Sequence, residues 1–308
     1  MKTIGTVIAT YNGERYVEEQ IDSIFNQSLR PHKIIVVDDC STDKTAGIVA
    51  RYRGAHPEII IFEQNEKNMG YVKTFEHGIS ICQTDYIAIS DQDDIWKPDK
   101  IEKCYHTLEQ NKEAKLCFHD LEFIDGNGNP LGKNFWESAL IPLPMSGTEA
   151  RKRLANLING VPGCTMFFSS DLKEYLLPMP DSKWSGHDWW IAVVGFFLAN
   201  PIIVNEVLTR YRIHENQTCA LAVNIKRKKK RRSFKDILFR IKRETKRIML
   251  RRRITKIRSV EKKERERALS QDVLKAITMY ETFNLSHIPK EELFSLKDIL
   301  ESNTRDMD

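Results

Sequence analysis

The sequence has no apolar run long enough to cross a membrane. Its longest uninterrupted apolar stretch, Trp189 to Ala199, has eleven residues, whereas a transmembrane helix needs about 20. We therefore interpret this stretch as a buried helix. The first residues, MKTIGTVIATYNG, also lack the charged and apolar leader of a signal peptide, and their pattern predicts a strand.

Cysteine pairs suited to a zinc site or a disulfide framework are missing as well. The 308 residues include six cysteines, and none of them forms a C-x-x-C pair. This spacing predicts reduced, mostly buried thiols in a cytosolic protein. The chain also has no P-loop and no G-x-G-x-x-G motif, so neither of these phosphate-binding loops is expected.

Charge is distributed unevenly along the chain. The net charge is +5, yet residues 226–267 hold 22 lysines and arginines against 5 acidic residues, and the rest of the chain has an excess of 12 acidic residues. We expect a globular domain over 1–223 and a basic, helical C-terminal region over 224–308. In the basic region, apolar residues keep helical spacing among the cations.

The first half of the chain alternates strand and helix patterns. We predict strands over 3–9, 33–37, 58–62 and 86–90, and helices over 12–28, 43–53, 70–82 and from Pro98 onward. Such alternation predicts an α/β fold: a Rossmann-like, mainly parallel sheet with flanking helices. The second half predicts strands over 115–124, 165–169 and 202–213, helices over 148–158 and 186–198, and a turn at 125–130.

Ligands of such sheets bind beyond the carboxyl ends of the parallel strands. Three carboxylates, Asp91, Asp93 and Asp94, follow the fourth strand within four residues. A hard divalent cation prefers oxygen ligands of this kind and leaves room for phosphate oxygens. A solvated acidic loop, or a cap for the helix after Pro98, is the alternative interpretation.

Two further carboxylates, Asp38 and Asp39, end the second strand. A carboxylate in this place can accept a hydrogen bond from a nucleobase imide N–H or a ribose hydroxyl. The residues that follow, Ser41 to Asp43, can equally cap the next helix. Both interpretations can hold, with Asp39 binding a ligand and Asp43 acting as the cap.

Two later segments could also carry chemistry. Asp188 begins the most apolar helix, beside two tryptophans, where a helix N-terminus stabilises a carboxylate. Such a carboxylate is often only structural, but in a partly apolar pocket it can serve as a general base. The segment Arg210 to Gln217 places cations and His214 at a strand end, which suits phosphate or metal binding, although a lone histidine is more often structural.

Together, the segments VIATYNG, VVDDCSTDKT, NMGYVKTFEHGI, SDQDDIWKPDKI, GHDWW and YRIHENQT occur in the order and spacing of family 2 glycosyltransferases, over about residues 1–218. The chain resembles that family, and in particular its bacterial rhamnosyltransferase-like branch. The resemblance implies a GT-A fold and inverting transfer of a sugar from a nucleoside-diphosphate donor. The acceptor would be a glycan or a polyprenyl-linked molecule in cell-surface polysaccharide synthesis.

The resemblance also implies roles for single residues, carried over by position. Asp188 would be the catalytic base, with His187 replacing the glutamate that is common before it. Mg²⁺ or Mn²⁺ would be bound by Asp93 and His214. The nucleotide sugar would be bound by Thr10, Tyr11, Asn12, Asp39, Asp91 and Gln92, and the sugar or acceptor would contact Trp96, His187, Trp189 and Trp190. The SDQDDIW and DWW variants imply dTDP-L-rhamnose as donor, with a UDP-hexose as the alternative.

The basic region admits three interpretations. A solvated helix with this charge would repel itself, and nucleic-acid binding is not expected because the segment lacks interleaved aromatics and any named module. Docking on an anionic membrane surface fits the apolar and cationic spacing. We therefore predict a cytoplasmic enzyme, peripheral at the inner face of the plasma membrane. Its rival, a non-catalytic nucleic-acid- or membrane-binding protein, is disfavoured by the intact Asp39, Asp93 and Asp188.

Overall fold

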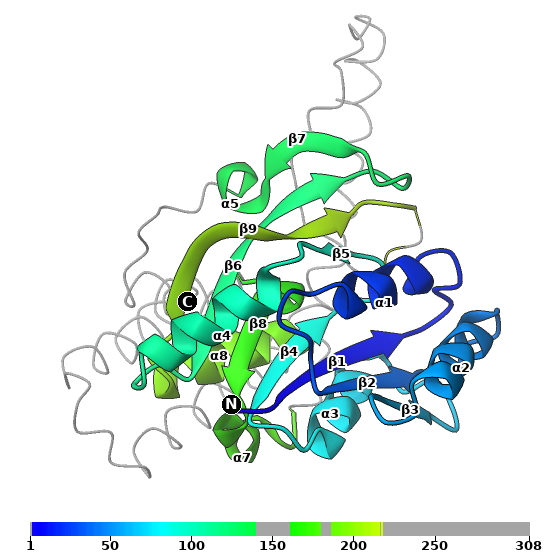
Figure 1. Cartoon of the computed structure of the whole chain (residues 1–308), viewed down its shortest axis with the longest axis horizontal. Coiled ribbons are helices and arrows are strands. Elements are labelled where there is room, and N and C mark those ends of the chain that lie inside the picture. Colours follow the sequence, from blue (N-terminus) through cyan, green and yellow to red (C-terminus); the bar gives the residue numbers. More distant parts are fainter. Residues whose placement is uncertain (1, 140–160, 180–185, 216, 218–308) are drawn as a thin grey trace, which may run out of the picture.

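The computed structural model describes residues 2–139, 161–179, 186–215 and 217 (Figure 1). Its first half alternates strands and helices as predicted: β1 (Ile4–Thr10), α1 (Val17–Phe25), β2 (Lys33–Asp38), α2 (Thr45–Ala55), β3 (Ile60–Gln64), α3 (Tyr71–Ile81) and β4 (Tyr86–Ser90). The second half adds β5 (Ile95–Trp96), α4 (Lys100–Gln110), β6 (Leu116–Ile124), β7 (Pro130–Asn134), α5 (Phe135–Ser138), η1 (Gly163–Thr165), β8 (Met166–Ser169), η2 (Ser170–Leu172), α7 (Lys173–Leu176), α8 (His187–Leu198) and β9 (Ile202–Arg212).

All strands of the described part belong to one sheet, in the order β3-β2-β1-β4-β8-β6-β9-β5, with β7 paired to β6 (Figure 1). Strands β1 to β4 are parallel, as the alternating pattern predicts. β6 and β9 also pair in parallel, but the other pairings of the sheet are antiparallel. β8 runs antiparallel to both of its neighbours, and β5 and β7 are also antiparallel to their partners. The sheet is therefore mixed, whereas a mainly parallel sheet was predicted.

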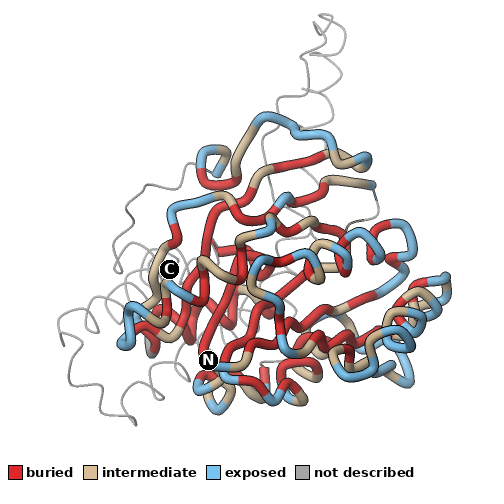
Figure 2. Tube along the Cα trace, in the orientation of Figure 1, coloured by how far each residue is buried: buried red, intermediate tan, exposed pale blue. Residues whose placement is uncertain are grey.

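The central strands are buried on both faces (Figure 2). Alternate residues along β1 and β2 point to opposite faces, so Val7 and Ile35 join one apolar cluster, whereas Ile8 and Ile34 join another. Residues of α3, α7 and α8 pack on the first face. Residues of α1, α2 and α4 pack on the second. This two-sided cover leaves the carboxyl ends of the strands as the natural place for a site.

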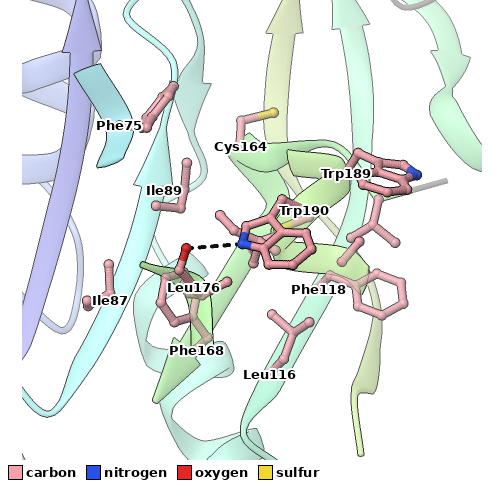
Figure 3. Packing of buried hydrophobic residues seen from close by; sticks show 14 of the residues in the cluster. Phe75, Ile87, Ile89, Leu116, Phe118, Cys164, Phe168, Leu176, Trp189 and Trp190 are labelled. Carbon is pink, nitrogen blue, oxygen red and sulfur yellow. Dashed lines mark hydrogen bonds between the residues drawn. The ribbon is translucent and has the colours of Figure 1, made fainter. Parts of the chain in front are cut away.

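The apolar stretch beginning at Trp189 forms the buried helix that its composition predicts (Figure 3). Both of its indoles are buried, and the Nε1–H of Trp190 donates to the carbonyl oxygen of Leu176 at 3.0 Å. Gly195 lets the helix approach the sheet, because a Cβ atom there would lie only 2.2 Å from a methyl carbon of Leu116. Packing of this kind fixes the start of α8, where Asp188 lies.

Several element boundaries differ from the prediction. The first helix, predicted over 12–28, begins only at Val17, and Asn12 has a φ of +47° outside it. The predicted turn at 125–130 is present, where Asp125 accepts hydrogen bonds from the backbone N–H groups of Asn127 and Asn129. The predicted helix over 148–158, the domain boundary at 223/224 and the basic region lie outside the described residues. No helix of the described ranges has the length and apolar character of a membrane span.

Candidate functional site

The polar segments that follow β1, β2 and β4 come together at one edge of the sheet. The Thr10 hydroxyl donates to the Asp38 carboxylate at 2.8 Å. The backbone N–H of Asn12 donates to the Ser41 hydroxyl, and the Asn12 side chain accepts from the backbone N–H of Thr42. Direct hydrogen bonds therefore join the residues after β1 to those after β2.

Gln92 links the acidic turn to the loop after β1. Its side-chain amide accepts from the Tyr11 backbone N–H at 2.8 Å and donates to the Tyr11 carbonyl at 3.0 Å. Gly13 makes room for this contact, since a Cβ atom there would lie 2.2 Å from Gln92 Oε1. Gln92 thus acts on the shape of the site, while Tyr11 remains 45% exposed and available to a ligand.

The carboxylate of Asp39 is bound by residues that precede α3. Its Oδ1 accepts hydrogen bonds from the Asn65 side chain (2.8 Å) and the Met69 backbone (2.7 Å), and its Oδ2 accepts one from the Gly70 backbone (2.8 Å). A carboxylate oxygen can accept two hydrogen bonds, so Oδ2 retains acceptor capacity. Asp39 is only 3% exposed and orders the loop before α3. Its Oδ2 is the oxygen left to accept an N–H of a nucleobase. No sequence pattern predicts Asn65 or Gly70 as its partners.

The acidic turn after β4 concentrates three carboxylates, Asp91, Asp93 and Asp94, within four residues. Burial raises the pKa of Asp91 to about 7, and the charges of Asp93 and Asp188 add to this effect. The pKa of Asp94 is also raised, by its complete burial and by the charges of Asp93 and Asp91. Carboxylates in this state are poised to bind a positive charge.

Asp93 and His214 are 121 residues apart in the sequence and lie in contact in the structure. The Oδ2 of Asp93 lies 2.8 Å from the Nε2 of His214, whose ring packs on Tyr16. Two adjacent ligands of an octahedral Mg²⁺ or Mn²⁺ lie about 3 Å apart, because each is about 2.1 Å from the ion. The two side chains therefore fit neighbouring positions around one divalent cation, and Asp91 is the nearby carboxylate that could join them.

A deeper cluster lies behind this pair. Single ligand atoms of Asp91, Asp94 and Cys164 are all within 4.8 Å of one another. Burial keeps the pKa of Cys164 well above its ordinary value, so the thiol stays protonated and is a poor ligand for a hard cation. We interpret this cluster as a buried, structural part of the site.

Asp188 lies in the first turn of α8, where its Oδ1 accepts a hydrogen bond from the backbone N–H of Trp189 at 2.7 Å. The adjacent η1 segment brings Asp188 close to the acidic turn: Gly163 abuts the Asp188 side chain, and Cys164 abuts Asp91. The structure therefore brings Asp188 and the acidic turn into one site.

The four side chains predicted to contact sugar or acceptor are mostly buried. His187 is 6% exposed and stacks on Phe75, and burial lowers its pKa to about 4, so it is neutral at neutral pH. The indoles of Trp96, Trp189 and Trp190 lie in the apolar clusters with at most 4% exposure. Their burial gives all four a packing role and leaves little ring surface for a sugar.

Two buried cations have roles that the sequence did not predict, although Arg212 lies in the segment that was expected to bind phosphate or metal. Arg212 is 1% exposed and binds the Asp93 carbonyl and the Glu19 carboxylate. Lys100 is also 1% exposed and lies behind Cys164. Arg210 and Arg212 share one face of β9 by strand periodicity, yet Arg210 is exposed. Only the tertiary structure distinguishes them.

Comparison with known proteins agrees with this geometry. Residues 6–176 match the model of glycosyl transferase family 2. An uncharacterized glycosyltransferase of Methanocaldococcus jannaschii is 32% identical over 214 residues, which cover 68% of this chain and 70% of that protein. The Bacillus subtilis protein TuaG, named as a candidate glycosyltransferase of teichuronic acid biosynthesis, is 31% identical over 131 residues, or 42% of this chain and 51% of that one.

Solved structures show the same fold at lower identity. Staphylococcus aureus TarS 1–349 in complex with UDP-GlcNAc has a TM-score of 0.56 and 20% identity, over 70% of this chain and 60% of that one. The mannosyltransferase PcManGT of Pyrobaculum calidifontis, in complex with GDP-Man and Mn²⁺, has a TM-score of 0.53 and 17% identity, over 70% and 58%. The match thus spans less than two thirds of either solved chain. With the family match over more than half of its length, the chain belongs to glycosyl transferase family 2 and is a glycosyltransferase with a GT-A-like fold.

Proposed function

We propose that the protein is a metal-dependent, inverting glycosyltransferase that uses a nucleoside-diphosphate sugar, with dTDP-L-rhamnose as the donor. The observation that carries the proposal is the meeting of Asp188 with the acidic turn in one site, close enough for Asp188 to raise the pKa of Asp91. An inverting transfer needs two parts: a base for the acceptor hydroxyl and a site that stabilises the charged leaving group. Asp188 and the acidic turn would supply them at the same edge of the sheet.

The donor would bind along the ends of β1, β2 and β4. The exposed Tyr11 ring offers a stacking face, and Asp39 Oδ2 can accept the imide N–H of thymine or uracil. Thr10, Asn12 and Gln92 use their polar groups within the protein, so they set the shape of the pocket. Both bases present the same imide N–H, which is why a UDP-hexose stays the alternative donor.

The diphosphate would lie over the acidic turn. Asp93 and His214, with Asp91 beside them, are the residues that would hold Mg²⁺ or Mn²⁺. When bound, the cation supplies Lewis-acid charge that stabilises the leaving nucleoside diphosphate. Asp93 is held in place for this task, because its own carbonyl accepts a hydrogen bond from the buried Arg212.

Asp188 would act as the general base for the acceptor hydroxyl. Its carboxylate would accept the proton of the acceptor hydroxyl as that oxygen attacks the anomeric carbon and the diphosphate leaves. One displacement inverts the configuration and needs no covalent enzyme intermediate, so one base is sufficient. Glycoside hydrolysis, in contrast, usually needs two carboxyl groups flanking the bond.

A panel of nucleotide sugars tests this proposal through thermal stability. We expect dTDP-rhamnose with Mn²⁺ to raise the melting temperature by several degrees, since a ligand at 100 times its Kd adds about 2.7 kcal/mol to the free energy of unfolding. Omitting Mn²⁺ or introducing Asp93→Asn should remove most of that shift. Asp171→Asn is the matched control, because Asp171 is exposed and forms a surface ion pair with Lys115. A panel without any shift, or a shift that survives Asp93→Asn, would contradict the proposal.

The cellular role that we propose is synthesis of a cell-surface polysaccharide on a glycan or polyprenyl-linked acceptor, at the cytoplasmic face of the plasma membrane. TuaG, a relative over part of the chain, is named for such a pathway. The charge of residues 226–267 supports attachment to an anionic membrane, since each cation near such a surface contributes about 1 kcal/mol.

Neutralising the cluster KRKKKRR at 226–232 tests this attachment. We expect the full-length variant with seven glutamines to lose most of its co-sedimentation with phosphatidylserine-containing vesicles, whereas the wild-type protein sediments with them at low salt. Neutral phosphatidylcholine vesicles are the control. Equal sedimentation of variant and wild type, or preference of the wild type for RNA over vesicles, would contradict membrane docking.

A further inference from the structure

Asn65 lies beside the carboxylate that is proposed to bind the nucleobase. It follows the last residue of β3, and its backbone N–H donates to the Asp38 carbonyl oxygen at 2.8 Å. This bond extends the pairing of β3 with β2, so the sheet itself sets the position of the Asn65 backbone. The side-chain amide contacts Asp39, at the end of β2, and residues of α3. Asn65 therefore connects two strand ends and a helix.

The surroundings of the Asn65 amide permit only one orientation of it. Its Nδ2 donates to Asp39 Oδ1 at 2.8 Å and to the Thr74 hydroxyl at 3.2 Å, and its Oδ1 lies 3.4 Å from His77 Nδ1. The Thr74 hydroxyl donates its own proton to the Gly70 carbonyl at 3.0 Å, so toward Asn65 it can only accept. A reversed amide would turn its oxygen toward a carboxylate and this hydroxyl, and neither has a proton to donate to it.

This orientation decides which oxygen of Asp39 remains for a ligand. Oδ1 accepts from the Asn65 amide and from the Met69 backbone N–H, which uses both hydrogen bonds that a carboxylate oxygen can readily accept. Within the described part of the chain, Oδ2 accepts only from the Gly70 backbone N–H. Without the amide, each oxygen would accept one backbone N–H and the two would be equivalent. The amide thus makes Oδ2 the one oxygen with capacity left.

We propose that Asn65 is a positioning residue that gives Asp39 its preference for a base with an imide N–H, such as thymine or uracil. It holds the carboxylate so that one oxygen alone is offered to the N3–H of the base. This role rests on the proposed function, in which Asp39 binds the base. Among the described residues, the Asn65 side chain makes no hydrogen bond to the acidic turn after β4. Recognition of the base can therefore be lost while binding of the diphosphate is kept.

The test measures binding of dTDP and of its N3-methyl derivative, each with Mn²⁺, to the full-length protein by titration calorimetry. The methyl group replaces the imide proton and leaves the ribose and diphosphate unchanged. Wild type should bind dTDP about tenfold more tightly than the derivative, as expected for a hydrogen bond to a charged group. Asn65→Leu has a side chain of similar size without the amide, and it should lose most of this preference. Inorganic pyrophosphate with Mn²⁺ should bind to Asn65→Leu as to wild type.

Gln64→Met is the matched control on the same strand end. The Gln64 side chain donates to Asp38 at 3.3 Å, so its removal should leave the preference for dTDP unchanged. Asn65→Ala is the second variant and should lose the preference as Asn65→Leu does. Because Asn65 is only partly buried, the smaller side chain should be tolerated by the fold.

Three outcomes separate this role from the proposed function. A wild-type preference for dTDP in either Asn65 variant would overturn the positioning role. An equal loss of dTDP and pyrophosphate binding would also overturn it, because Asn65 would then support the whole site. If wild type binds neither dTDP nor its derivative, or binds both equally, the proposed contact between Asp39 and the base fails, and the role of Asn65 fails with it.

Discussion

Asp188→Asn is expected to abolish sugar transfer while leaving donor binding intact. Asparagine has the size of aspartate and can still accept the hydrogen bond from the Trp189 backbone N–H, so the first turn of α8 should keep its geometry. It cannot take a proton from the acceptor hydroxyl. General-base catalysis contributes about 10²–10⁴-fold, and the transfer rate at saturating donor and acceptor should fall by that amount.

Donor affinity distinguishes loss of the catalytic base from general damage to the site. The Asp188 charge is one of the causes that raise the pKa of Asp91, so its removal lets Asp91 ionise more readily. Binding of Mn²⁺ and nucleotide sugar, measured by calorimetry, should therefore be equal to wild type or tighter. Asp171→Asn serves again as the control for an exposed carboxylate. Transfer at the wild-type rate in Asp188→Asn would place the base elsewhere, and loss of donor binding would mean that the substitution damaged the site.

The placement of the strand-end residues could be predicted because it depends on local patterns. The order of strands and helices up to β4 follows from apolar periodicity, and parallel strands necessarily bring Thr10, Asp39 and Asp91 to one edge. The mixed character of the sheet could not be predicted in the same way. β8 inserts between β4 and β6 as an antiparallel strand, and a four-residue apolar strand carries no information about its direction.

The indoles show a different limit of the sequence. Two tryptophans beside a carboxylate fit either sugar stacking or a core, and the choice depends on which side of α8 meets the sheet. The structure buries both Trp189 and Trp190, and the Nε1–H of Trp190 is satisfied by a backbone carbonyl (Figure 3). Lys100 shows the opposite limit. A lysine between Asp99 and Ile101 at a helix start is ordinarily solvated, yet in the structure it is 1% exposed.

Arg212 is the residue whose loss should most reduce the stability of the site. From the end of β9 its guanidinium reaches the Asp93 carbonyl (2.8 Å), the Gly126 carbonyl (3.3 Å) and Glu19 (2.6 Å), and it covers the Tyr16 ring at 4.6 Å. One side chain thus connects α1, the acidic turn and the β6–β7 turn. The Glu19 side chain is 54% exposed, so solvent screens that ion pair and the buried contacts carry most of the effect.

Arg212→Met keeps much of the aliphatic volume and removes every one of these polar contacts. We expect the free energy of unfolding to fall by about 2–4 kcal/mol, which corresponds to a melting temperature lower by roughly 5–10 °C. The Asp93 carbonyl would lose its buried donor, so the acidic turn should loosen. As a consequence, Mn²⁺ and nucleotide sugar together should stabilise the variant less than they stabilise wild type.

Arg210→Met provides the matched control on the same strand. Arg210 is 44% exposed in its side chain and pairs with Glu122 at the surface, so its loss should change the free energy of unfolding by no more than about 1 kcal/mol. If Arg212→Met were as stable as Arg210→Met, the buried contacts would not hold the turn. If it were unstable but kept the full stabilisation by Mn²⁺ and donor, Arg212 would support the fold without positioning Asp93. Only a loss in both measurements assigns Arg212 to the geometry of the metal-binding turn, because global stability and ligand linkage report on different parts of its contact set.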